Sequence, residues 1–202
     1  FNASTFASFL ISCTSETIKA NLEALLMQYD NLEDNLADYN RKIEEICEKP
    51  EYKPAVKALS CFRGINHLTA ITFATELGDI RRFKHPRQVT SYAGLDIIEF
   101  SSGGHERKFS SSKNGNRYIR TAAVEASQAT DKTLRISREL KLRRQGMEQK
   151  YIDVADRCMR RLNLKSRRLL AKGKHRNKVK VACAREMLSF IWEAMQLTAT
   201  AT

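Results

Sequence analysis

The stretch from Ser15 to Glu48 reads SETIKANLEALLMQYDNLEDNLADYNRKIEEICE and carries an unbroken heptad pattern. Its apolar positions alternate spacings of four and three residues: Ile18, Leu22, Leu25, Tyr29, Leu32, Leu36, Tyr39, Ile43 and Ile46. Such spacing keeps one apolar seam along a helix, and most residues between the seam positions are acidic or polar. The sequence therefore predicts one long helix, capped by Thr14 or Ser15 and ending before Pro50.

A seam of more than four heptads predicts that this helix pairs with another helix, whereas a long amphipathic helix packed on its own domain is the simpler alternative. The partner could be another helix of the same chain in an antiparallel arrangement. The hypothesis that we favour is pairing of residues 15–48 with the same segment of a second chain. Residues 1–50 would then form a dimerisation segment of a homo-oligomer, with a tetramer as a further possibility.

The chain has 202 residues and a net charge of +12, and the positive excess lies entirely in its second half. Residues 1–100 contain 11 Lys and Arg against 14 Asp and Glu, whereas residues 101–202 contain 24 against 9. A polyanionic partner is therefore expected, and nucleic acid is the commonest one. No apolar run reaches the roughly 18 residues of a membrane-spanning helix, so a membrane is not expected as a partner.

The five cysteines are widely spaced, without a CxxC pair, and the four histidines show no metal-ligand spacing. The sequence therefore predicts reduced thiols and no metal site within this chain.

Residues 54–77 resemble a helix-hairpin-helix motif. A helix begins near Lys53, a tight apolar turn contains Gly64-Ile65-Asn66, and a second helix covers His67–Leu77. In that motif the N–H groups at the start of the second helix face a DNA phosphate, which makes Gly64 and Asn66 candidate phosphate-binding residues. Asn66 stands where the motif usually has its second glycine, and Asn also tolerates a left-handed backbone. An ordinary helical hairpin in the core is the alternative.

Residues 95–116 form the loop on which we expect the chemistry to lie. A strand-like run covers residues 95–100, and the sequence SSGGHERKFSSSKNGN follows over residues 101–116, with a return strand expected over residues 105–109. Gly103 and Gly104 allow a tight turn. A serine on such a turn, among fixed cations, could attack a phosphodiester, because neighbouring positive charge stabilises the transition state. A polar loop without chemistry is the alternative.

Residues 117–196 are helical in pattern and very basic. Asn116 is expected to cap a helix that begins with Arg117 and Arg120, and a nearby anion would explain these two cations better than helix stability does. A basic nucleic-acid face is expected farther on, with a merely solvated face as the alternative: Arg157, Arg160, Arg161, Arg167 and Arg168. The predicted fold is mainly α, with the long N-terminal coiled-coil helix, a compact helical domain over residues 51–197 and at most a small β-hairpin.

Six short motifs fall in order over about sixty residues: Gly64-Ile65, Glu76-Leu77-Gly78-Asp79, Tyr92-Ala93-Gly94-Leu95, Ser102-Gly103, Ser112-Lys113-Asn114-Gly115-Asn116 and Tyr118-Ile119-Arg120. In this order and spacing they resemble the C-terminal serine domain of the DEDD-type insertion-sequence transposases. These enzymes are relatives of the Piv/MooV DNA invertases and of recombinases guided by a bridge RNA. The resemblance covers roughly residues 15–196.

The resemblance implies DNA transposition or site-specific recombination, with DNA and a structured guide RNA as partners, in the cytoplasm and nucleoid of a bacterial or archaeal cell. Carried onto this sequence, the nucleophile falls on Ser102, with Ser101 as the fallback. The phosphate contacts fall on Lys113, Asn114, Arg117 and Arg120.

The family also places a RuvC-like domain, which holds Mg²⁺ on four acidic residues, before the coiled coil. This sequence has no acidic quartet on alternating strands, so we expect it to be the C-terminal part of a transposase, metal-free and inactive alone. Two other functions stay open. A non-catalytic helix-hairpin-helix module would bind nucleic acid without using Ser102, and a coiled-coil scaffold would not need the basic surface.

Overall fold

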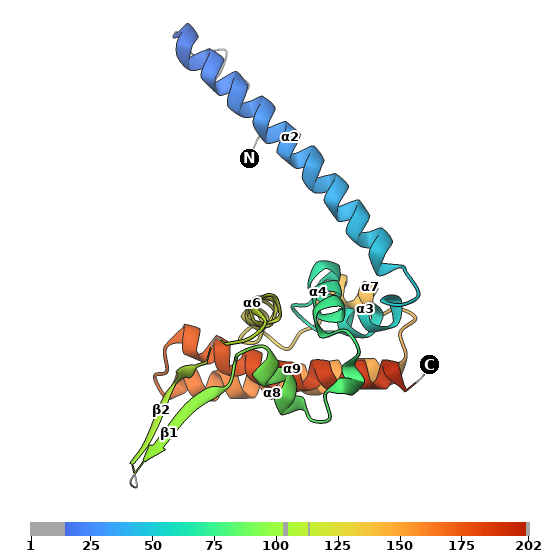
Figure 1. The fold of residues 1–202 in the computed structure, drawn as a ribbon. Helices are drawn as coiled ribbons and strands as arrows, with labels where there is room; N and C mark the ends of the chain where they lie inside the picture. The colour runs from blue at the N-terminus through green and yellow to red at the C-terminus, as the bar shows by residue number, and fades with distance from the viewer. Residues whose placement is uncertain (1–14, 103–104, 113, 201–202) are drawn as a thin grey trace. The chain divides into compact units, whose positions relative to one another are not determined.

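The computed structural model describes residues 15–102, 105–112 and 114–200, and gives the backbone alone for residues 97–102 and 105–111. Helices dominate, as the sequence predicts (Figure 1): α2 (Glu16–Cys47), α3 (Lys53–Ser60), α4 (His67–Leu77), α5 (Pro86–Tyr92), α6 (Arg117–Ala126), α7 (Arg138–Arg143), α8 (Gln149–Ala171) and α9 (Arg176–Ala199). Two short 3-10 helices, η1 (Ile80–Arg82) and η2 (Ser127–Ala129), and a hairpin of β1 (Ile97–Ser102) and β2 (His105–Ser111) complete the described elements. The chain divides into two units between Glu45 and Ile46.

Within the described residues, the first unit contains α2 as far as Glu45, and α2 confirms the predicted long helix over 32 residues. Its apolar seam is exposed in the single chain, where Leu25, Leu32 and Leu36 leave 58%, 67% and 59% of their surfaces open to solvent. Exposure of so many large apolar side chains on one helix is typical of a surface that another helix covers. The partner of the seam stays a prediction.

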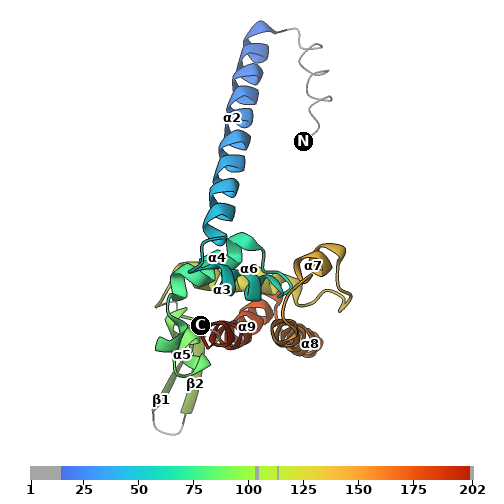
Figure 2. The same cartoon turned by 90° about the vertical axis from the view of Figure 1, so that its right-hand side faces the viewer.

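The second unit is organised around α9, whose apolar side chains are buried along its length. Figure 2 looks along α8 and α9 and shows α9 lying between α5 and α8, with α3, α4 and α6 to one side. The core between these helices contains large, fully buried side chains, among them Phe62, Phe73, Leu188 and Ile191. Burial of apolar surface, which contributes about 25 cal/mol per Å², is the main favourable free energy that holds such helices together.

The turn between α3 and α4 packs against the end of α6. Gly64 has φ of 86°, and a Cβ built on it would lie 2.3 Å from the backbone oxygen of Ala126. Only glycine fits both this backbone conformation and this close approach. Asn66 does not adopt the left-handed backbone expected of it: its φ is −98°, and its side chain caps α4 by accepting a hydrogen bond from the N–H of Thr69 at 2.8 Å.

The β1–β2 hairpin leaves the helical body after α5. The strands pair antiparallel from Ile97 opposite Ser111 to Ser102 opposite His105, with an irregularity near Ile97. The N–H of Ser112 donates to the carbonyl of Asp96 at 3.0 Å, which closes the end of the hairpin nearest the body. The predicted small hairpin is confirmed, and β2 extends beyond the expected return strand to Ser111.

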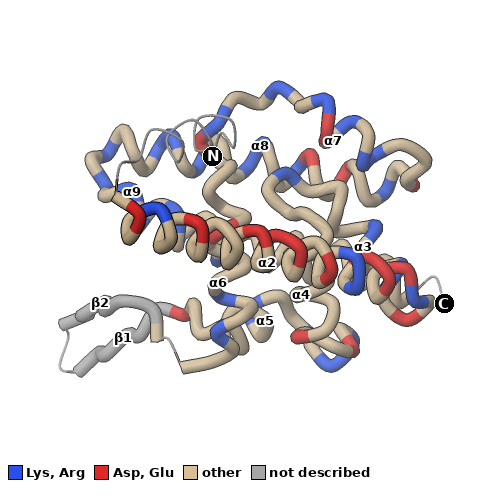
Figure 3. The backbone as a smooth tube through the Cα atoms, turned by 90° about the horizontal axis from the view of Figure 1, so that it is seen from above, with Lys and Arg blue, Asp and Glu red and all other residues tan. Residues whose placement is uncertain are grey.

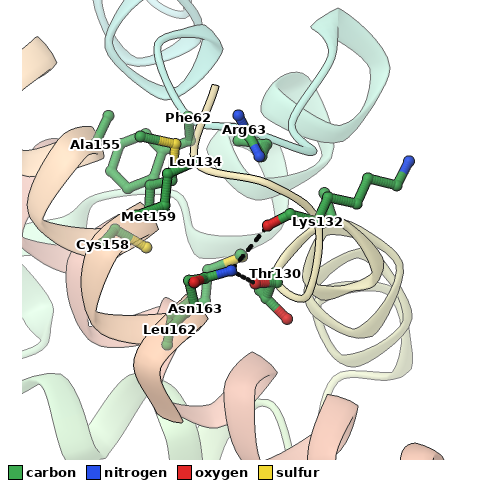
Figure 4. A pocket seen from close by; sticks show the side chains of 12 residues that line it. Phe62, Arg63, Thr130, Lys132, Leu134, Ala155, Cys158, Met159, Leu162 and Asn163 are labelled. Atoms are coloured by element: carbon green, nitrogen blue, oxygen red, sulfur yellow. Dashed lines mark hydrogen bonds between the residues drawn. The ribbon is translucent and has the colours of Figure 1, made fainter. Parts of the chain in front are cut away.

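The connection from η2 to α7 has no regular secondary structure over residues 130–137 and is held by buried polar groups. The side-chain amide of Asn163 on α8 donates to the carbonyls of Thr130 and Lys132 at 2.9 and 2.8 Å (Figure 4). Lys180 on α9 reaches the same connection and forms an ion pair with Asp131 at 2.8 Å. The pocket drawn in Figure 4 has a volume of about 10 Å³, so it has room for no more than one water molecule.

The described cysteines are all buried: Cys47, Cys61, Cys158 and Cys183. Burial raises the pKa of the thiols of Cys61, Cys158 and Cys183, which keeps them protonated and poorly reactive at neutral pH. Within the described ranges, no helix has the length and apolar character needed to cross a membrane.

Candidate nucleic-acid interface

The strands of the hairpin carry the two candidate nucleophiles. The backbones of Ser101 and Ser102 pair with Glu106 and His105 at the end of β1 that leads into residues 103 and 104. The serine side chains lie outside the described part of the structure, as do Gly103 and Gly104. The backbone of Ser102 thus lies at the turn end of the hairpin. Figure 1 shows that the strands extend away from the helices.

The structure separates Ser102 from the cations that the sequence placed around the same phosphate. Five residue steps along β1 from Ile97 to Ser102 span about 17 Å at the usual rise of a strand. Arg120 lies at the opposite end of the hairpin, where its Nη1 donates to the carbonyl of Ala93 at 3.0 Å. The sequence expectation that Ser102, Arg117 and Arg120 converge is therefore not met in this chain, because the loop folds into an extended hairpin.

The start of α6 is closed by a well-defined cap. Asn116 accepts hydrogen bonds from the N–H groups of Tyr118 and Ile119 at 2.9 and 3.0 Å, as the sequence predicts, and it donates to Glu76 on α4 at 2.6 Å. Arg117 is exposed, with its guanidinium 5.5 Å from the ring centre of Tyr118. Asn114 is also exposed, and Lys113 lies outside the described residues. Arg117 and Asn114 are thus accessible to an anion at this end of the hairpin.

Two residues near the same end were missed by the sequence analysis. The guanidinium of Arg82 lies 4.5 Å from the ring centre of Phe83 and 4.7 Å from that of Tyr92. Hydrogen bonds to Arg82 and then to Asn116 lower the pKa of Tyr92. The spacing of these residues in the sequence does not predict the contact between Arg82 and Tyr92, because α5 folds back and places Tyr92 beside Arg82.

The basic face predicted on α8 divides into two sets. Arg157 forms an ion pair with Glu193 of α9, and Arg161 and Lys165 both contact Glu186 at 2.6 Å. Burial alone would raise the pKa of Glu186, but hydrogen bonds from Arg161 and Lys165 outweigh it and lower that pKa. Arg157 and Arg161 therefore join α8 to α9, and their predicted role as phosphate ligands would compete with these carboxylates.

The second set consists of cations at the outer face of α8 and around the α8–α9 turn. The sequence contains no Asp or Glu from residue 157 to residue 185. Seven of its Lys and Arg residues are exposed and have no ion-pair partner among the residues described: Arg160, Arg167, Arg168, Lys172, Lys174, Arg176 and Lys178. We call this set the basic turn. Figure 3 shows Lys and Arg recurring along α8 and around its junction with α9.

The α8–α9 junction and the hairpin lie at the same end of the helical body (Figure 1). Arg185 on α9 donates to the carbonyl of Leu95, two residues before β1, at 2.7 Å. Nine residues separate Arg176 from Arg185, which is about 14 Å along the helix axis. A polyanion on the basic turn would therefore reach the hairpin within a few nucleotide steps.

No group of three or more His, Cys, Asp and Glu side chains in the described ranges could hold a metal ion. Three acidic residues near the interface form ion pairs with cations: Glu186 and Glu193 with side chains of α8, and Asp131 with Lys180. The described residues thus do not fit a Mg²⁺ site.

Comparison with known proteins connects this arrangement to mobile elements. Residues 56–141 match the Transposase IS116/IS110/IS902 family. The chain is 36% identical over 147 residues, or 71% of its length, to y4qE of Sinorhizobium fredii, which carries a transposase name. It is 27% identical over 147 residues to the transposase for insertion sequence element IS1111A of Coxiella burnetii, and 36% identical over 61 residues, or 30% of its length, to that for IS1533 of Leptospira borgpetersenii.

The chain is thus similar to insertion-sequence transposases over part of its length. It spans 38% of y4qE, 40% of the IS1111A protein and 18% of the IS1533 protein. The match to the transposase family runs from α3 into α7 and so includes the α3–α4 turn, the hairpin and the start of α6. The basic turn lies beyond it, and its cations stand out only by their exposure and their lack of carboxylate partners among the described residues.

Proposed function

We propose that this chain is the nucleic-acid-binding part of a DNA transposase, and that DNA lies across the basic turn next to the hairpin. The observation that carries the proposal is the set of seven exposed cations without carboxylate partners in the described chain. Lys and Arg at such positions bind phosphates by displacing condensed counterions, so the binding is strong at low salt and tolerant of sequence. A structured guide RNA has the same backbone charge and is a second ligand that this surface would accept.

The chemical part of the proposal concerns Ser102, with Ser101 as the fallback. The hydroxyl of Ser102 would lose its proton as its Oγ forms a bond to the phosphorus, while the bond from phosphorus to one deoxyribose oxygen breaks and that oxygen takes up a proton. The hairpin supports this role, because its extended strands present the serine backbone away from the helices, where a DNA strand has access. Activation of the serine and any contribution of Mg²⁺ are assigned to parts of the transposase outside this chain.

We further propose that α2 joins two copies of the chain through its apolar seam. The heptad pattern and the exposure of the seam support a second copy of α2 as its occupant. A dimer would place two hairpins and two basic turns in one particle, which suits an enzyme that exchanges strands between two DNA sites.

Salt-dependent binding of fluorescent duplex DNA tests the nucleic-acid interface. In a variant with Arg160, Arg167 and Arg168 replaced by Gln, we expect the slope of log affinity against log salt to become less negative by roughly 0.9 for each phosphate that the protein no longer neutralises. The control replaces two arginines that form ion pairs with Glu193 and Glu186, Arg157 and Arg161, and should change the slope less for each charge removed. An unchanged slope in the first variant would contradict the proposed interface.

The serine is tested in the full-length transposase supplied with its DNA and guide. A protein–DNA adduct that survives denaturant should form with the wild type and with Ser101→Ala, but not with Ser102→Ala. Adduct formation by Ser102→Ala and not by Ser101→Ala would assign the reaction to Ser101. If neither change matters, the chain is better described by the second candidate function, a binding module without a nucleophile.

A further inference from the structure

A second cluster of cations surrounds a pocket that shares no lining residue with the basic turn. The pocket has a volume of about 430 Å³ and is formed by three segments: the α3–α4 turn, the connection of residues 129–137, and α7. Its lining includes four cations, Arg63, Lys132, Arg135 and Arg143, against one acidic residue, Glu139. An excess of positive charge inside a concave surface is typical of an anion site.

Two of these cations are fixed in the wall of the pocket. Arg63 donates to the backbone carbonyls of Thr133 and Arg135, and Arg143 donates through Nη1 to the carbonyl of Ile65 in the α3–α4 turn. These hydrogen bonds join the three segments and hold both guanidinium groups at the pocket. The wall is therefore already ordered before any ligand arrives, which lowers the entropic cost of binding.

The fixed cations are not fully satisfied. The Nε of Arg143 is buried and has no hydrogen-bond acceptor among the described residues, since the nearest carboxylate oxygen, on Glu139, is 3.9 Å away. Burial, and then the charge of Arg144, lower the pKa of Arg63. A buried donor without an acceptor and crowded like charges both cost free energy, and an anion in the pocket would offset the like charges.

The other two cations stand at the rim. Lys132 and Arg135 are exposed and have no ion pair with any residue in the described ranges. Asn66, the N-cap of the 11-residue helix α4, also lines the pocket, so the positive end of that helix lies beside it. Flexible cations at a rim and fixed ones in the wall could together surround a tetrahedral oxyanion.

We propose that this pocket binds a phosphate of the nucleic-acid backbone, as a contact site separate from the basic turn. This proposal rests on the proposed function, because its ligand is the nucleic acid that we propose for the basic turn. Arg144 links the two regions: it donates to the carbonyl of Cys61 in the α3–α4 turn at 3.0 Å and pairs with Asp156 on α8 at 2.8 Å. Arg160 lies only about 6 Å from Asp156 along the axis of α8, but Lys172 lies about 24 Å away, so one phosphate cannot contact both the pocket and the cations at the α8–α9 junction.

Binding of a fluorescent 20-base-pair duplex to the whole chain tests the pocket. The variant Lys132→Gln/Arg135→Gln removes only rim side chains and keeps the backbone carbonyls that Arg63 holds. We expect its salt slope to become less negative by roughly 0.9 for each of the two phosphates that these side chains would neutralise. The control Arg138→Gln/Lys141→Gln makes the same charge change on exposed residues of α7 that do not line the pocket, and should shift the slope less.

Inorganic phosphate serves as a local probe. Amide resonances of Gly64 and Asn66 in the turn should shift when phosphate is added to the wild type, and should shift less in Lys132→Gln/Arg135→Gln. An unchanged slope in that variant, or no phosphate-induced shift in the wild type, would overturn the pocket proposal while leaving the basic turn intact. If the wild type binds no DNA at low salt, the proposed function itself fails.

Discussion

Replacing Gly64 by Ala tests whether the α3–α4 turn is held in place by its close approach to α6. Two costs combine at this position. An L-residue with φ of 86° pays the left-handed backbone penalty of about 1–2 kcal/mol. In addition, the new Cβ would lie 2.3 Å from the carbonyl oxygen of Ala126, so one of the two backbones must move by most of an ångström. Overpacking of this kind typically costs about 1–3 kcal/mol.

The sum predicts that Gly64→Ala lowers the free energy of unfolding by about 2–5 kcal/mol. Gly173 provides the matched control. Its φ is 69°, nothing lies within 4 Å of a Cβ placed there, and the N–H groups of Gly173 and Lys174 donate to Leu170 and Leu169 in the usual C-terminal cap. Gly173→Ala should therefore cost only the backbone term, about 1–2 kcal/mol.

Urea denaturation of both variants, followed by circular dichroism, measures the difference through the midpoints at equal slope. Equal losses of stability for Gly64→Ala and Gly173→Ala would refute the reasoning, because they would show that the Ala126 carbonyl imposes no steric limit. If Gly64→Ala is already unfolded without urea, its loss of stability lies in the upper part of the expected range. A stabilising osmolyte is then added to refold the variant, and thermal melting measures its stability.

Three further outcomes are expected. In light scattering, Leu25→Asp with Leu32→Asp should convert an oligomer to a monomer, because each introduces a charge into the apolar seam; a wild-type monomer at micromolar concentration would contradict pairing through α2. Lys180→Met should destabilise the chain by about 1–3 kcal/mol in urea denaturation, because it removes the ion pair with the half-buried Asp131 and the hydrogen bond to the carbonyl of Gln128. The hydrogen bond from Lys180 lowers the pKa of Asp131 below its ordinary value, which is near 4. The pair therefore contributes its full stabilisation at pH values above about 4, and this contribution is lost as the pH falls through the lowered pKa. Asp131→Asn should flatten that acidic part of the stability profile, and a profile identical to the wild type would exclude the ion pair as its source.

Several elements could be predicted from the sequence because their causes are local. The heptad spacing of α2 places its apolar residues on one side of any helix that they form, whatever surrounds it. Asn116 caps α6 as predicted, since an N-cap needs only the N–H groups two and three residues ahead. The strand-like run before Ser101 and the glycine pair after Ser102 likewise predict a hairpin from neighbouring residues alone.

The candidate site was harder to predict, because its geometry depends on residues far apart in the sequence. The sequence grouped Ser102 with Arg117 and Arg120 by their proximity along the chain. In the fold, β1 carries the serine backbone about 17 Å from the end of the hairpin where Arg120 is bound to Ala93. Asn66 was expected to take a glycine-like backbone and instead caps α4, since its conformation is set by the helix that follows it.

The sequence by itself determined the helical class, the long amphipathic helix and the positive charge of the second half. Only the tertiary structure decided which of those charges are free to meet a polyanion. Arg157 and Arg161 lie in the same stretch as Arg160, Arg167 and Arg168, yet they are held by carboxylates 36 and 25 residues farther on. Those contacts exist because α9 returns alongside α8, and the register of that packing is fixed by the apolar core between the helices rather than by the charges themselves.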